Sequence, residues 1–223
     1  MKDIIQFLAA LKQNNDRGWF QKHKTEYIAA QGAFNAFVEK LIAGIVSFDD
    51  SVSGVNVKDC IYRIYRDTRF SADKSPYKTH MGAFVCPGGR KSDYSGYYFQ
   101  VGPEESGYPE GNMLATGNYR LDSKVMHILR EDICMDAEDF EQRLKQASLF
   151  KLDDTDMLKR VPNGFERNAP YSGYLMYKAY CLVYSPGKSF MTGDDLLERT
   201  LGAFRSTKPF LQYLNRAIAY SKE

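Results

Sequence analysis

Apolar residues recur at helical spacing through the first 47 positions of the chain. Between Ile4 and Leu11 they fall on one face of a predicted short helix, for which Asp3 is a candidate cap. From about Thr25 to Ser47 they return close to every 3.6 residues, which predicts a long amphipathic helix. The chain is therefore expected to begin with helices that each bury one face.

The middle of the chain changes to a composition typical of β-strands. The segments CIYRIY (60–65), MGAFVC (81–86) and YSGYYFQV (94–101) are rich in β-branched and aromatic residues. The intervening PGGRKSD (87–93) is typical of a hairpin connection. Two further strands are expected in NMLATG (112–117) and YKAYCLVY (177–184).

Helical patterns return at 122–132, at 137–147 and in the C-terminal tail. TGDD at 192–195 has the form of a capping box, and Thr207 with Pro209 indicates a second helix start. Helices at both ends around hairpin-connected strands predict an α+β fold. We expect a central, mainly antiparallel sheet with the N-terminal and C-terminal helices packed on it, in a single domain spanning residues 1–223.

Charge adds one local feature to this picture. The 223 residues carry a formal net charge of only +2, so no global field attracts nucleic acid or a membrane surface. Residues 58–80, however, hold six basic and three acidic residues, a net charge of +3. Four scattered cysteines without a CxxC pair indicate reduced thiols, and no apolar run approaches the roughly 18 residues of a membrane helix. We expect a cytoplasmic protein without a membrane partner; its oligomeric state is not predicted.

The segment RIYRDTRFSADKSPYKTH (63–80) concentrates the candidate chemistry. Guanidinium groups bind phosphate or carboxylate through a bidentate fork, and lysine adds a mobile point charge. This composition favours binding of an anionic small molecule. The predicted ligand-binding residues are Arg63, Arg66, Arg69, Asp73, Lys74, Tyr77 and Lys78.

Two alternatives remain open for the same residues. Arg66 and Arg69 with Asp67 and Asp73 are also suited to a structural ion-pair network in a non-catalytic interaction or scaffold protein. Alternatively, tyrosines beside the basic residues are suited to stacking on the bases of nucleic acid. The tyrosines considered for this role are Tyr62, Tyr65, Tyr97 and Tyr98.

Catalytic candidates are few. Asp67 and His80 are the residues suited to acid–base chemistry, and the sequence does not decide whether the protein is an enzyme. Asp59 could join Asp67, Asp73 and His80 around a divalent ion, but no established metal motif is found and we predict no metal site. No nucleotide-binding or cofactor motif is found either, and no cofactor is predicted.

Eight positions of this segment carry a resemblance to a known family. They are Arg63, Arg66, Asp67, Arg69, Phe70, Asp73, Lys74 and Tyr77. Together with FLAALKQNNDRGWFQKHKTEY (7–27), YKTHMGAF (77–84) and PFLQYLNRAI (209–218), this pattern resembles the bacterial family known as domain of unknown function 2461. The resemblance covers nearly the whole chain. It implies the fold and the location of the site, but no particular chemistry.

Overall fold

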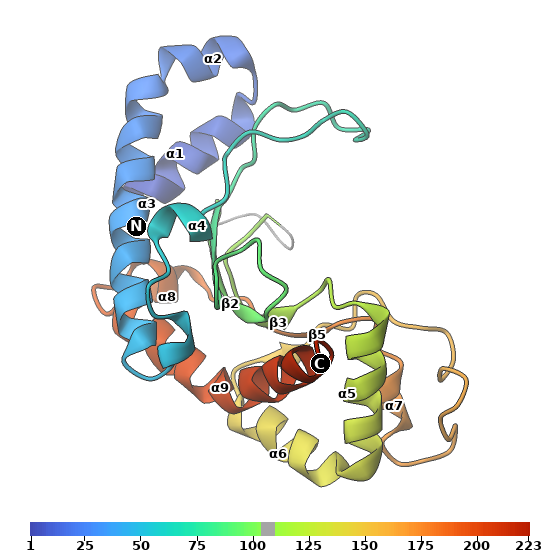
Figure 1. Ribbon diagram of the computed structural model, residues 1–223. Coiled ribbons are helices and arrows are strands. Elements are labelled where there is room, and N and C mark those ends of the chain that lie inside the picture. Colours follow the sequence, from blue (N-terminus) through green and yellow to red (C-terminus); the bar gives the residue numbers. More distant parts are fainter. Residues whose placement is uncertain (104–109) are drawn as a thin grey trace.

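The computed structural model describes residues 1–103 and 110–223 (Figure 1). Its N-terminal region consists of α1 (Lys2–Gln13), α2 (Arg17–Lys22) and α3 (Lys24–Val46). The carboxylate of Asp16 accepts a hydrogen bond from the backbone of Trp19 and so caps α2. Both predicted N-terminal helices are confirmed.

The described strands form one antiparallel sheet in the order β1-β2-β3-β5-β4. The predicted strands at 81–86, 94–101, 112–117 and 177–184 are confirmed, and the α+β class with them. Their bounds are β1 Met81–Val85, β2 Gly96–Val101, β3 Met113–Asn118, β4 Lys151–Leu152 and β5 Tyr180–Tyr184.

One face of the sheet is covered by α3 and by α9 (Leu196–Tyr220). Phe99 of β2 packs against Phe37 of α3 with 4.7 Å between ring centroids, and Tyr97 packs against Phe204 of α9. Because side chains alternate along a strand, Gly96, Tyr98 and Gln100 point to the opposite face. This opposite face, here called the open face, bears the larger of the two cavities described below.

The C-terminal helix differs from the sequence prediction. Helix α9 runs through Pro209 without a break, so the second helix start predicted at Thr207 is wrong. The buried hydroxyl of Thr207 contacts that of Thr116 in β3, and the carbonyl of Pro209 accepts a hydrogen bond from Arg143. Packing along the whole buried face of α9 thus outweighs the hydrogen bond that proline removes. The predicted capping box also does not form, because Thr192 ends a separate short helix, α8 (Lys188–Thr192).

The remaining helices frame the sheet. Asp122 and Asp136 cap α5 and α6 through side-chain hydrogen bonds to the backbone. The bounds are η1 Asp50–Val52, α4 Val57–Cys60, α5 Ser123–Met135, α6 Ala137–Gln146 and α7 Ser172–Leu175. Within the described part of the chain, no helix combines the length and the apolar character needed to cross a membrane.

Residues 61–80 form an arm that projects from the sheet (teal in Figure 1). The predicted strand at 60–65 is not formed: Cys60 ends α4, and the two limbs of the arm are joined by one isolated bridge, between Tyr65 and Tyr77. Pro76 explains part of this difference, because it has no N–H group to donate to the opposite limb. Strand-like composition in this segment therefore produces an extended but irregular structure.

Candidate functional site

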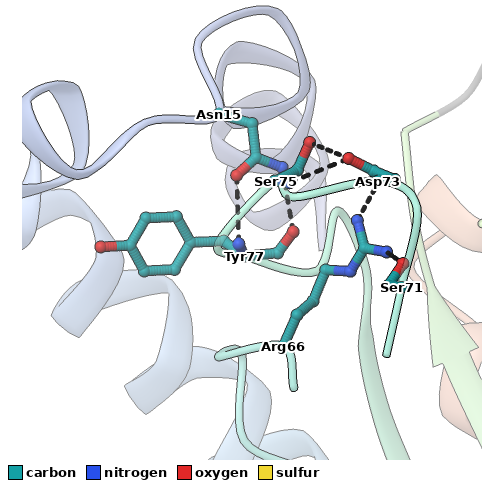
Figure 2. Close-up of polar contacts among 6 residues, drawn as sticks. All are labelled: Asn15, Arg66, Ser71, Asp73, Ser75 and Tyr77. Carbon is teal, nitrogen blue, oxygen red and sulfur yellow. Dashed lines mark hydrogen bonds and ion pairs between the residues drawn. The ribbon is translucent and has the colours of Figure 1, made fainter. Parts of the chain in front are cut away.

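The base of the arm is fixed by one asparagine. The side chain of Asn15, which follows α1, donates to the carbonyl of Tyr77 at 2.9 Å and accepts from its N–H at 3.1 Å (Figure 2). The ring of Tyr77 points away from these contacts and stacks on Phe20 of α2, with 3.9 Å between the centroids. Asn15 thus imitates a strand partner and holds the arm against the N-terminal helices.

Within the arm, two arginines are paired with aspartates. Arg66 forms an ion pair with Asp73 and a hydrogen bond with Ser71 (Figure 2). Arg69 binds both carboxylate oxygens of Asp67, at 3.0 and 2.6 Å. The hydrogen bonds from Arg69 lower the pKa of Asp67 to about 2. The pKa of Asp73 is also lowered, by hydrogen bonds from Ser75 and Arg66.

A cavity of about 460 Å³ lies between α1 and the arm. Four of the predicted ligand-binding residues line it: Arg66, Asp73, Tyr77 and Lys78. The other residues that line it are Lys12, Asn15, Asp67, Ser75, Thr79, His80 and Glu110. Three predicted residues, Arg63, Arg69 and Lys74, line neither this cavity nor the larger one on the open face. The structure therefore brings only part of the predicted set together.

A second group of cations surrounds Tyr62. The ammonium of Lys78 lies 5.3 Å from the centre of the Tyr62 ring, and the guanidinium of Arg90 lies 5.5 Å from it. The pKa of Lys78 is lowered first by burial and then by the charges of Arg63 and Arg90. Among the described residues, none of these three cations forms an ion pair with a carboxylate.

Buried polar atoms without partners lie beside this group. Thr79 Oγ1 and His80 Nδ1 are buried, and neither has a hydrogen-bond partner within the described structure. The pKa of His80 is lowered to about 4, mainly by burial and further by the charge of Lys78. Because buried polar groups are normally hydrogen-bonded, these two atoms indicate a place where an additional partner would be accommodated. We call Tyr62, Lys78, Thr79, His80 and Arg90 the junction cluster, because His80 lines both cavities.

Arg90 is a site residue that the local sequence pattern does not indicate. Arg90 belongs to the connection between β1 and β2, where its Nε donates to the carbonyl of Ile61 at 2.9 Å. Its N–H also donates to the carbonyl of Asp59. The sequence PGGRKSD is typical of a turn, and nothing local in it indicates that this turn folds back onto the arm and brings Arg90 to the site.

The two catalytic candidates, Asp67 and His80, have pKa values too far below 7 for efficient acid–base catalysis near neutral pH. Asp67 is bound by Arg69, and its pKa of about 2 makes it a weak base. His80, with a pKa of about 4, is neutral at pH 7. Within the described part of the chain, no three His, Cys, Asp or Glu side chains gather closely enough to hold a metal ion.

Comparison with known proteins gives one match. The model of the family described as conserved hypothetical protein (DUF2461) matches residues 3–213. The chain belongs to this family. No curated protein and no solved structure gave a match. Membership in DUF2461 agrees with the resemblance carried by residues 63–77, and the family description assigns no activity.

Proposed function

We propose that this DUF2461 protein binds a small anionic molecule, bearing a phosphate or a carboxylate, at the junction cluster. The observation that carries the proposal is the set of three cations, Arg63, Lys78 and Arg90, that lack a carboxylate partner among the described residues. Lys78 is partly buried, and its neighbours disfavour its charged form. A bound anion would stabilise the charged form of Lys78 against both its burial and the neighbouring positive charges.

The buried atoms beside these cations support the same proposal. Thr79 Oγ1 and His80 Nδ1 have no hydrogen-bond partner among the residues that the structure describes, and both residues line the cavity that Lys78 also lines. The hydroxyl of Thr79 and a neutral imidazole are each able to donate a hydrogen bond to an anionic oxygen. Charge-assisted hydrogen bonds of this kind are about twice as strong as those between neutral groups.

The rest of the predicted set contributes less to the proposed site. Arg66 and Arg69 are engaged by Asp73 and Asp67, so their charges are already offset within the arm. Lys74 donates to the carbonyl of Thr68 and lines neither cavity. The ring of Tyr77 is buried and stacks on Phe20, so it is not available to a ligand. The proposed anion contacts are therefore Lys78 and Arg90, and Arg63 adds positive charge near Lys78.

Nucleic acid remains the alternative ligand, but the geometry supports it less. Tyr97 is fully buried and donates a hydrogen bond to Asp49 at 2.8 Å, so its ring is not accessible to a base. Tyr65 packs near Phe20 and Tyr77; it is 49% exposed but lines neither cavity. Only Tyr62 and Tyr98 of the four considered tyrosines line the larger cavity.

Titration with simple anions tests the proposal. Pyrophosphate and citrate are added separately, each against sodium chloride of equal ionic strength, and the melting temperature and the heat of binding are recorded. We expect at least one of the two anions to raise the melting temperature beyond the chloride control, because ligand that binds only the folded state stabilises it. The anion that does so distinguishes phosphate from carboxylate recognition.

Two lysine variants decide which residues are responsible. Lys78→Gln is expected to lose the response, whereas Lys74→Gln, on the same arm but outside both cavities, is expected to keep it. A response to neither anion, or one that survives in Lys78→Gln, would overturn the proposal. Loss in Lys74→Gln alone would place binding on the outer arm instead.

A further inference from the structure

The larger cavity, about 670 Å³ in volume, lies on the open face of the sheet next to the junction cluster. Small-molecule sites typically measure about 300–1,000 Å³, so this volume is sufficient for a whole ligand. His80 belongs to both cavities, and Tyr62, which contacts Lys78, lines the larger one. If the anionic group of a ligand is bound at the junction cluster, the rest of the ligand would therefore extend into the cavity over the open face.

The floor of this cavity includes one row of small residues, beside the side chains of Tyr98, Met113 and Val183. Gly96, Gly117 and Cys181 are partners across three neighbouring strands and form one row of the open face. Gly117 has φ of +136°, and a Cβ there would lie 2.3 Å from the carbonyl oxygen of Tyr180. The backbone geometry thus demands glycine at this position, and its consequence is a flat surface that a ligand can approach closely.

The walls of the cavity combine aromatic rings with charged and polar side chains. The charged and polar residues are Arg90, Lys91, Ser92, Asp93, Asn118, Arg120 and Asp153. Tyr62 and Tyr98 meet edge to face, with 6.1 Å between centroids and 74° between ring planes. Tyr119 stands at the rim with 68% of its surface exposed, and the guanidinium of Arg120 lies 5.7 Å from its ring centre. Flat rings in this arrangement favour a flat ring as their partner.

The thiol in the floor contributes surface instead of reactivity. Burial raises the pKa of Cys181 to about 12, so the thiol stays protonated at pH 7 and is a poor nucleophile. Beside it in the sheet, Ala115 and Val183 complete an apolar floor. This floor is therefore suited to binding an apolar part of a ligand and supplies no reactive thiol.

From this arrangement we infer that the ligand is a phosphate-bearing molecule with a flat aromatic ring, of the size of a mononucleotide. Its phosphate is held by Lys78 and Arg90, and its ring lies on the glycine row between Tyr62, Tyr98 and Tyr119. Several cations at one end match a group that carries more than one negative charge, which favours a phosphate ester over a single carboxylate. This inference rests on the proposed anion site and specifies the rest of the ligand.

Four probes test the inference by isothermal titration calorimetry. AMP has both parts of the ligand, ribose 5-phosphate lacks the ring, adenosine lacks the phosphate, and pyrophosphate tests the anion site alone. We expect AMP to bind about tenfold or more tightly than ribose 5-phosphate, because stacking of a base on an aromatic side chain is worth about that factor. Adenosine is expected to bind more weakly than AMP.

A substitution in the floor separates the two proposals. Ala115→Leu places additional carbon atoms between Tyr98 and Val183 and leaves the junction cluster unchanged. We expect this variant to lose the advantage of AMP over ribose 5-phosphate while its response to pyrophosphate persists. If Ala115→Leu does not fold, Tyr119→Ala at the exposed rim replaces it. This second variant is also expected to reduce the advantage of AMP over ribose 5-phosphate.

The outcomes are distinguishable. Equal binding of AMP and ribose 5-phosphate, with pyrophosphate still bound, would overturn the inference and leave the anion site standing. Failure of all three phosphates would overturn the inference, and the anion site would fall with it if citrate is not bound either. Tight, steeply salt-dependent binding of a mixed single-stranded oligonucleotide, without binding of AMP, would also overturn the inference and would identify the open face as a nucleic-acid platform.

Discussion

At the scale of single residues, the surroundings of His80 decide its protonation. Its imidazole lines the cavity between α1 and the arm together with Lys78, Arg66 and Glu110, and the charges of all three act on it. Burial and the two cations lower its pKa to about 4, and Glu110 opposes them only in part. The folded protein therefore holds a neutral His80 at neutral pH.

Stability should consequently fall as the pH falls from about 6.5 to about 4. In this window the unfolded chain binds a proton at His80 and the folded protein does not, so acid favours unfolding. This single group is expected to account for up to about 3 kcal/mol of the free energy of unfolding. Urea unfolding of His80→Gln measures it: the variant should lose less stability than the parent protein between pH 7 and pH 4.

The control for this experiment is His127→Gln, which removes an exposed imidazole from α5. Identical pH dependence in the parent protein and in His80→Gln would show that His80 is not held neutral.

At the scale of elements, the arm is held against the N-terminal helices by Asn15 and by the stacking of Tyr77 on Phe20. Asn15 satisfies both backbone groups of Tyr77, and each such hydrogen bond contributes about 1 kcal/mol to stability. The limbs of the arm are otherwise joined by an isolated bridge and a few backbone hydrogen bonds. Asn15 thus acts as the connection between α1 and the proposed site.

We expect Asn15→Ala to destabilise the protein by about 1–3 kcal/mol, because it leaves two partly buried backbone groups without partners. Urea unfolding measures the loss, and proteolysis within residues 66–76 should become faster. Asn14→Ala is the matched control, since Asn14 is exposed and its side chain donates only to Ala10. Equal stability of the two variants would contradict this account of the arm.

At the scale of the whole molecule, the covered face of the sheet and the arm should differ in local stability. β2 and β3 have neighbours on both sides, and their core-facing side chains pack on α3 and α9. Residues 66–75 have no ladder of strand hydrogen bonds and include Phe70, which is 97% exposed. Local opening is easiest where buried contacts are few.

Hydrogen exchange followed by mass spectrometry tests this difference. Amides of residues 97–101 and 114–117 are expected to exchange last, and those of residues 66–75 to exchange first. Addition of a bound anion should slow exchange in residues 77–80 more than in α5 or α6, which are remote from the junction cluster. Protection of residues 66–75 as strong as that of β2 would contradict the prediction.

Local sequence pattern was sufficient for most of the fold. The helical period of residues 25–47 predicts a long helix and the aromatic composition of residues 94–101 predicts a strand, and both elements form close to the predicted bounds. The pattern failed where tertiary packing outweighs local preference. α9 passes through Pro209 because its whole face is buried, and residues 60–65 pair only through isolated bridges, of Ile61 with Ala83 and of Tyr65 with Tyr77.

The sequence by itself also located the chemically distinctive segment, since charge and aromatic content are local properties of residues 63–80. Only the tertiary structure decided which of those charges are already offset. Arg66 meets Asp73 within the arm, whereas Lys78 meets Arg90 from a connection between two other strands. The cavity on the open face likewise requires three strands to be placed side by side. Such contacts depend on the path of the chain in space, and residue order alone does not contain their distances.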